Sequence, residues 1–128
     1  MLKDKDSSAI VAVSDIDRAK DFYGRVLGLE ATESMGDEVV AYRTGRTGLT
    51  VYRSDYAGTN KANAVTWEGG DELSAIVDDL KAKDVLFEHY DMPGAAFDGA
   101  VHHADGMDLV WFKDPDGNIL HLIGKASA

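Results

Sequence analysis

Histidine is the side chain best suited to proton transfer near neutral pH, and the sequence contains four histidines, one of which lies in an unusual place. His121 is the polar residue of the aliphatic stretch ILHLI, residues 119–123. An imidazole in this setting can act as a general base, with Tyr52 or a loop histidine as partner. It can equally be a neutral imidazole without chemistry. We take His121 as the candidate catalytic residue and keep both interpretations.

Metal binding is the other chemistry that imidazoles offer. His102 and His103 lie in a Gly-containing segment, residues 92–106, that is predicted to be a long loop or lid, and His89 lies beside it. These three could join His121 around a divalent ion. Adjacent loop histidines more often face solvent, however, and no ligand spacing such as HxxxH is present. The chain has no cysteine, which excludes thiolate catalysis and cysteine-type zinc sites. We expect no metal, with a relocated metal site as the alternative.

Charge and composition exclude several partners. The chain of 128 residues has 13 Lys and Arg against 23 Asp and Glu, a formal charge of −10 that repels phosphate backbones, so no nucleic-acid partner is expected. No apolar run approaches the ~20 residues of a membrane-spanning helix, and no secretory signal is seen. We expect a cytoplasmic protein without a membrane partner. The length fits one domain, 1–128, and no nucleophile elbow, P-loop or dinucleotide motif occurs.

The elements that must position these residues fall into two similar sets. In the first, residues 8–14 are typical of a strand, and a helix that ends near Leu27 is capped by Ser14, Asp15 or Asp17. Three short antiparallel strands follow between residues 29 and 53. A polar linker, about 55–62, precedes the second set.

The second set repeats the order of the first. Residues 64–68 are predicted to form a strand and residues 69–84 a helix with Asp71 near its cap. Strands follow at 85–90, 108–113 and 118–123, with the predicted loop in between. The chain is therefore an α+β protein of two βαβββ modules in tandem, about 8–54 and about 63–124.

A tight turn sets the direction of the last strand. In DPDGN, residues 114–118, Asp116 and Gly117 supply the positive-φ position of a hairpin turn, and Asn118 can bond back to the turn. Residues 119, 121 and 123 then point to one face of the sheet, and Leu120 and Leu122 point to the other.

The stretch VSDIDRAKDFYGRVLGLE, the central linker and WFKDPDGNILHLI resemble the vicinal oxygen chelate superfamily of glyoxalase I, extradiol dioxygenases and bleomycin resistance proteins. The resemblance extends from about Ser8 to Ile123. It implies that each module forms a curled half-sheet around a cavity, with the helices on the outer face. Leu120 and Leu122 would then face a helix, and His121 would face the cavity. In the cavity wall, a neutral His121 could hydrogen-bond to Thr50 or Ser8. It also implies a homodimer, because each half-sheet pairs with another to complete the cavity.

The resemblance also places four metal-ligand positions on this sequence, at Ser8, Thr50, Ala64 and His121. Metal-binding members carry His and carboxylate or amide side chains at these positions. Ala64 has no donor atom, while Ser8 and Thr50 are weak neutral hydroxyls, so the inherited site is expected to be absent. A register shift at Ala64 would offer Asn63 or Val65, and neither restores the site.

Aromatic residues on the predicted strands are the remaining candidates for ligand contact, although core packing explains each of them equally well. Tyr52 shares a face with Thr50, whereas Trp67 lies opposite to Ala64 and is expected to pack on a helix. Tyr42 and Trp111 fit either role. The candidate ligand-binding residues are Ser8, Thr50, Tyr52, Ala64, His102, His103, Trp111 and His121.

Together these expectations favour a metal-free protein that binds a small, planar or aromatic molecule, similar to the bleomycin-resistance-type sequestering proteins. The alternative is an enzyme of glyoxalase, isomerase or dioxygenase type, with a displaced divalent metal or with His121 as general base. A regulatory or purely structural domain is a third hypothesis.

Overall fold

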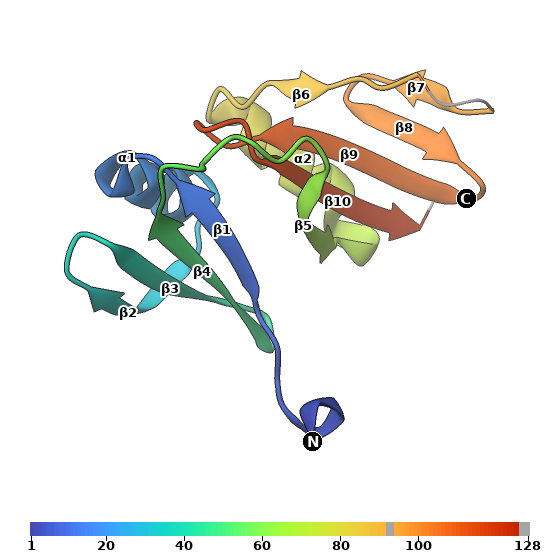
Figure 1. Cartoon of the computed structure of the whole chain (residues 1–128). Helices are drawn as coiled ribbons and strands as arrows, with labels where there is room; N and C mark the ends of the chain where they lie inside the picture. The colour runs from blue at the N-terminus through green and yellow to red at the C-terminus, as the bar shows by residue number, and fades with distance from the viewer. Residues whose placement is uncertain (92–93, 126–128) are drawn as a thin grey trace. The chain divides into compact units, whose positions relative to one another are not determined.

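A computed structural model describes residues 1–91 and 94–125, and the chain divides into two compact units, Met1–Asn60 and Lys61–Ala128 (Figure 1). Each unit contains one β-sheet with helical segments and has α+β architecture, as the sequence predicts. No helix among the described residues is long and apolar enough to cross a membrane.

The first unit has a four-stranded sheet in the order β1-β4-β3-β2, in which β1 pairs with β4 in parallel and the other pairs are antiparallel. The three antiparallel strands expected between residues 29 and 53 are confirmed. The elements are a 3₁₀ turn (Leu2–Asp4), β1 (Ala9–Val13), α1 (Ile16–Lys20), a π-helical segment (Asp21–Val26), β2 (Glu30–Met35), β3 (Val39–Thr44) and β4 (Thr47–Arg53).

The helix of the first unit begins at Asp15, whose carboxylate accepts a hydrogen bond from the backbone N–H of Arg18 at 3.0 Å. Asp15 is therefore the cap among the three residues that the sequence offered. The π-helical segment ends at Val26, and Gly28 follows with φ of 74°. The predicted helix end near Leu27 is confirmed.

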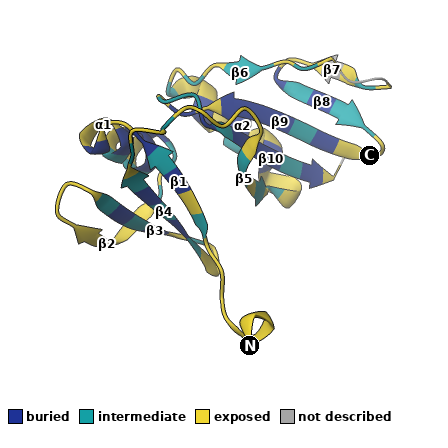
Figure 2. Ribbon diagram, viewed as in Figure 1, coloured by how far each residue is buried: buried dark blue, intermediate teal, exposed yellow. Residues whose placement is uncertain are grey.

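The core of the first unit lies between this helix and one face of the sheet. Tyr23 is fully buried and stacks on Tyr42 of β3, with ring centroids 6.2 Å apart. Strand residues alternate between buried and more exposed positions (Figure 2). The buried set is Val11, Val13, Val40, Tyr42, Leu49 and Val51. The opposite face of the sheet is therefore the open one, and Ile10 on it is 65% exposed.

The second unit has its strands in the order β5-β10-β9-β8-β7, and β6 pairs with β9. Here too the first strand, β5, pairs in parallel with the last, β10. Its elements are β5 (Asn63–Glu68), a 3₁₀ turn (Gly70–Glu72), α2 (Leu73–Ala82), β6 (Phe87–Glu88), β7 (Ala96–Asp98), β8 (Val101–Ala104), β9 (Met107–Lys113) and β10 (Ile119–Lys125). Asp71 lies in the 3₁₀ turn, directly before Glu72 at the N-cap of α2.

The prediction of one long loop over 92–106 is wrong for most of its length. Strands β7 and β8 form an antiparallel hairpin there, while residues 92 and 93 lie outside the described residues. Gly99 turns between the two strands with φ of 60°, and Asp105 and Gly106 turn into β9 with φ of 53° and 75°. The glycines on which the loop prediction rested are turn residues between short strands.

The turn between β9 and β10 is a buried polar network. One carboxylate oxygen of Asp114 accepts the backbone N–H groups of Asp116 and Asn118, both at 2.9 Å, and the other accepts the Asn118 side-chain amide at 2.8 Å. Asp114 and Asn118 are each 4% exposed, and Gly117 has φ of 88°. The predicted tight turn and the back-bonding of Asn118 are confirmed.

The register that this turn sets is the predicted one. A Cβ added to Gly124 of β10 would lie 3.0 Å from the carbonyl oxygen of Gly70 and 3.4 Å from Cβ of Leu73, at the start of α2. Because side chains alternate along a strand, Leu120 and Leu122 face α2 together with Gly124. His121 therefore lies on the opposite, open face of the second sheet.

Candidate functional site

The open face of the second sheet brings together side chains from three neighbouring strands. His121 on β10 lies opposite Thr66 on β5 and opposite Trp111 on β9. The rings of His121 and Trp111 are stacked, with centroids 4.6 Å apart and planes at 16°. Trp111 therefore faces the same side as His121, which decides between the two roles that the sequence left open for it.

The imidazole of His121 is held in one tautomer. Its Nδ1 lies 2.9 Å from the carbonyl oxygen of Val110, and because a carbonyl oxygen only accepts, Nδ1 carries the proton and Nε2 carries the lone pair. Burial lowers the pKa of His121 below its ordinary value of 6.5, and the bond to Val110 opposes this shift without reversing it. At neutral pH the ring is neutral, and Nε2 can accept a proton or a hydrogen bond.

Trp111 is itself held from several sides. Its indole N–H donates to Oδ1 of Asn63 at 3.2 Å, and the rings of Tyr90 and His102 contact it edge-on with centroids 5.3 and 4.9 Å away. Asn63 reaches the open face because the register shifts between Ile119 and Leu120, so that Asn63 lies opposite Ile119. The sequence did not single out Asn63 as a contact of Trp111.

His102 and His89 continue this row of rings, although the roles of their nitrogens are structural. His102 is fully buried, and its Nε2 accepts the backbone N–H of Tyr90 at 3.0 Å. The pKa of His102 is lowered, chiefly by burial. The ring of His89 lies 5.6 Å from that of His102, and its Nε2 donates to the carbonyl oxygen of Gly99 at 2.8 Å. Both imidazoles tie backbone segments together.

His103 points to the other side of the sheet. Its Nδ1 bonds to the buried carboxylate of Asp108, and its Nε2 lies 3.9 Å from Asp98. The structure thus brings His89, His102 and His121 to the open face and separates His103 from them. Within residues 1–91 and 94–125, no three His, Asp or Glu side chains gather as a metal site.

An open depression of about 380 Å³ lies over β5 and β10, and it includes two residues that the sequence predicted, Ala64 and His121. Because side chains alternate along a strand, Thr66 and Glu68 could have been predicted to share a face with Ala64. Asn63 breaks this alternation, and only the register shift in the structure reveals that it lies on the same face. The depression is lined by Asn63, Ala64, Val65, Thr66, Glu68, His121 and Ile123.

The site residues predicted in the first unit lie on the open face of the first sheet. Thr50 is opposite Ile10 and Ala41, and Tyr52 is opposite Ala12. The Cβ of Ser8 lies 3.8 Å from the position that a Cβ on Gly48 would take, which places Ser8 beside this face. Tyr42, by contrast, is 3% exposed and belongs to the core.

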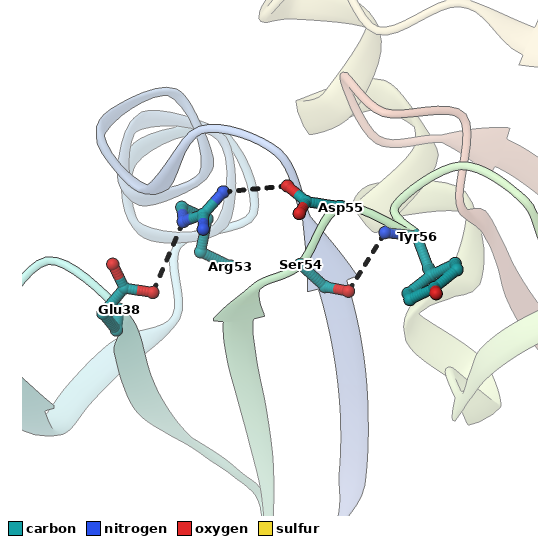
Figure 3. Close-up of polar contacts among 5 residues, drawn as sticks. All are labelled: Glu38, Arg53, Ser54, Asp55 and Tyr56. Carbon is teal, nitrogen blue, oxygen red and sulfur yellow. Dashed lines mark hydrogen bonds and ion pairs between the residues drawn. The ribbon is translucent and has the colours of Figure 1, made fainter.

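The chain leaves the first sheet through a set of polar contacts (Figure 3). The guanidinium of Arg53 at the end of β4 lies 3.4 Å from Glu38 and 3.3 Å from Asp55. The hydroxyl of Ser54 accepts the backbone N–H of Tyr56 at 3.1 Å, and the Tyr56 side chain is 78% exposed. Arg53 therefore fixes the start of the linker to β4 and to the turn before β3.

Comparison with known proteins gave a match to one family model, Glyoxalase/Bleomycin resistance protein/Dioxygenase superfamily, over residues 7–122. No curated protein sequence matches significantly.

Solved structures match the fold over nearly the whole chain at low sequence identity. A lactoylglutathione lyase from Agrobacterium tumefaciens is 19% identical with a TM-score of 0.72, and the match covers 94% of this chain and 93% of that one. The fosfomycin resistance protein FosX from Listeria monocytogenes is 14% identical with a TM-score of 0.74, covering 96% and 94%. A protein from the mobile metagenome of V. pseudocholerae is 20% identical with a TM-score of 0.64, covering 96% and 95%.

Proposed function

Because the chain belongs to the glyoxalase, bleomycin resistance protein and dioxygenase superfamily, we propose that it binds a small molecule on the open face of its second sheet and does so without a bound metal ion. The observation that carries this proposal is the chemistry of the depression. His121 offers one imidazole nitrogen there and Glu68 one carboxylate, while the neighbouring Ala64 has no donor atom. These two groups are fewer protein ligands than a stable zinc site has, and no group of three His, Asp or Glu side chains gathers among the described residues.

The other family ligand positions support the same conclusion. Ser8 and Thr50 carry hydroxyls, which are poor ligands for borderline divalent ions at neutral pH. His89 and His102 use Nε2 to bond to backbone groups, and His103 bonds to Asp108 on the other side of the sheet. Each of these imidazoles has one nitrogen in a bond to a protein group, and His103 is separated from His121 by the sheet.

The lining suggests what the ligand must offer. Ala64 and Ile123 give apolar surface, and Nε2 of His121 accepts a hydrogen bond. A planar or aromatic molecule with a hydroxyl or N–H group matches this combination, since its flat body covers apolar surface while its polar atom donates to Nε2. We expect the loss of this one bond to weaken binding by about five- to tenfold.

An enzyme is the second candidate, and the state of His121 favours it specifically. The neutral ring, with Nδ1–H bonded to Val110 and the lone pair on Nε2, is the arrangement of a general base. Such an enzyme would withdraw a proton from a ligand held in the depression. Binding and proton abstraction use the same nitrogen, so they are separated by whether a bound compound is converted.

The test is a thermal-shift screen of purified protein with planar antibiotics, catechols and thiol adducts of aldehydes, because a ligand that binds the folded state raises the melting temperature. His121→Ala should reduce the shift, while Met35→Ala, at an exposed position of β2 in the first unit, should not. Failure of every compound class to shift the melting temperature would contradict the binding proposal.

Elemental analysis and product analysis complete the test. Stoichiometric nickel, zinc, iron or manganese that is lost in His121→Ala would overturn the metal-free proposal. Conversion of a bound compound by the natural protein but not by His121→Ala would establish the enzyme alternative instead.

We also propose that the protein forms a homodimer, as superfamily members often do. Light scattering after gel filtration should give about twice the chain mass of 13.8 kDa. A mass equal to one chain would contradict this proposal without affecting the ligand proposal.

A further inference from the structure

Three side chains on the open face of the second sheet are linked in a row. Asn63 accepts the indole N–H of Trp111 at 3.2 Å, and the indole ring lies parallel to the imidazole of His121 at a centroid distance of 4.6 Å. Asn63 and His121 both line the depression. Trp111 and His121 are each only 8% exposed.

The stacked indole of Trp111 restricts rotation of the His121 ring, which the hydrogen bond to Val110 alone does not prevent. Rotation about χ2 of a histidine is broad, and one bond from Nδ1 to Val110 still lets the ring swing about that contact. A second flat ring packed parallel to the imidazole opposes this swing, because rotation would press the two rings together. The direction of Nε2 is therefore defined by two contacts.

The hydrogen bond to Asn63 holds the indole of Trp111 in place. The same bond determines which atom of the Asn63 amide remains for a ligand. An indole N–H only donates, so Oδ1 of Asn63 faces Trp111 and the amide nitrogen is the remaining polar atom of that side chain. A ligand in the depression then meets a donor at Asn63 and an acceptor at His121. Loss of the indole contact would allow the amide to turn over and reverse its polarity.

We infer that Trp111 is a positioning residue for His121, held in place by Asn63, and that together they aim Nε2 of His121 at the depression. The inference rests on the proposed function only in treating the depression as the ligand site. The positioning itself is a property of the free protein, so it can be tested without any ligand.

Other titratable groups near this row must be separated from His121 in the test. Glu68 lies on the same face of β5, and His102 on β8 contacts Trp111 from its edge. Glu88 of β6 pairs with Lys113 of β9 at 3.3 Å beside Trp111. His89 and Tyr90 lie beyond them, in the segment that follows β6. NMR of labelled histidine resolves each imidazole individually and therefore distinguishes His121 from these neighbours.

The first measurement is the ¹⁵N spectrum and pH titration of His121 in the free protein. In the natural protein we expect the Nδ1–H tautomer and a midpoint below the ordinary value of 6.5, since burial lowers the pKa of His121. In Trp111→Leu the tautomers should mix and the midpoint should move toward 6.5, because water reaches the ring. Trp111→Phe keeps an aromatic face and should stay close to the natural protein. An unchanged tautomer and midpoint in folded Trp111→Leu would overturn the inference.

The second measurement tests Asn63 and remains informative if Trp111→Leu does not fold. In a Trp67→Phe background the emission of Trp111 is observed alone, and protonation of the stacked His121 should quench it as the pH falls. His121→Gln should abolish this step, which identifies its source.

Asn63→Leu should reduce the depth of the quenching step, whereas Asn63→Asp, which still offers an oxygen to the indole, should restore it. Equal quenching in Asn63→Leu and the natural protein would overturn the role of Asn63. These results are independent of the ligand screen: if the screen finds no ligand, the positioning of His121 can still hold, and if the positioning fails, ligand binding can still be observed.

Discussion

The two sheets have the same plan, in which the first strand of each unit pairs in parallel with the last, and yet they present different chemistry. On the open face of the first sheet, Thr50 is flanked by Ile10 and Ala41. At the matching places of the second sheet, His121 is flanked by Thr66 and Trp111. One cross-strand trio has a threonine between two aliphatic side chains, and the other carries an imidazole stacked on an indole.

Directly beside these residues, the sides that pack on helices are alike. Leu49 of β4 and Leu120 of β10 occupy matching places, one residue before Thr50 and His121, and they are 1% and 0% exposed. Two units with the same topology both need apolar residues on the face of the sheet that packs on a helix. The residues on the open face are not constrained in this way and can differ between the units. The difference between the units predicts effects that can be measured.

The largest expected effect is a loss of stability when a leucine on the helix-facing side of either sheet is truncated. Leu49→Ala and Leu120→Ala should each lower the free energy of unfolding by ~2–5 kcal/mol, since each leaves a cavity in a packed core. Urea denaturation measures both. A loss below about 1 kcal/mol in only one of the two variants would show that the two helix-facing sides are packed differently.

The next effect is a difference in stability between variants of the two turns that precede β4 and β10. Asp114→Ala leaves two backbone N–H groups and the Asn118 amide without their buried acceptor, and should cost about 2–3 kcal/mol. Thr47→Ala in the exposed turn of the first sheet removes the bonds from the Thr47 hydroxyl to the carbonyl and hydroxyl of Thr44, and should change stability by less than ~0.5 kcal/mol because both groups are open to water. Thermal unfolding of the two variants checks this, and equal losses would contradict it.

A smaller effect comes from two strand glycines. A Cβ at Gly124 meets the Gly70 carbonyl oxygen at 3.0 Å, so Gly124→Ala should destabilise the chain by ~1–3 kcal/mol. A Cβ at Gly48 has its nearest contact at 3.5 Å, so Gly48→Ala should change stability by less than ~0.5 kcal/mol. The measurement is again urea denaturation. A tolerated Gly124→Ala would mean that α2 can move away from β10.

The smallest effect concerns pH, and it should arise in the second unit, which contains all four histidines. Burial lowers the pKa of His121 and of His102 below 6.5, so the unfolded chain takes up protons at a higher pH than the folded one. Stability is therefore full above 6.5 and declines as the pH falls through 6.5 toward the lower folded-state pKa values.

Hydrogen exchange measured between pH ~7.5 and ~5.5 shows the loss of stability separately for each unit. This range lies above the pH at which most carboxylates titrate, so the histidines dominate the change. Amides of β9 and β10 should lose protection as the pH falls, and His121→Gln should reduce the loss. An equal loss of protection in β3 and β4 would contradict the assignment to the second unit.

Much of the fold follows from patterns that the sequence displays directly. Alternation and turn residues predicted the strands of the first unit, the Asp116–Gly117 turn and the direction of His121, because each depends on neighbours in sequence. The hairpin β7–β8 was missed since its glycines resemble those of a loop. Reading residues 101–104 as a strand would also have placed His102 and His103 on opposite faces.

The candidate site was harder to predict from the sequence than the fold, because its contacts join residues that are far apart in the chain. The stacking of Trp111 on His121 follows once 114–118 is treated as a turn that pairs β9 with β10. The bond from Trp111 to Asn63 spans 48 residues and depends on a register shift that no alternation pattern reveals. The tautomer of His121 likewise depends on a carbonyl group of another strand.

The parallel pairing of β5 with β10 has a consequence for the order in which a growing chain can fold. Among the strands that the structure describes, β5 hydrogen-bonds to β10 alone, and these strands are the first and the last of the second unit. The first sheet can be completed once Arg53 has left the ribosome. The second must wait for residues 119–125, so β5 stays unpaired while residues 69–118 are made, and other chains could join its open edges during that time. A nascent chain arrested before Ile119 should therefore contain one finished sheet and one exposed strand.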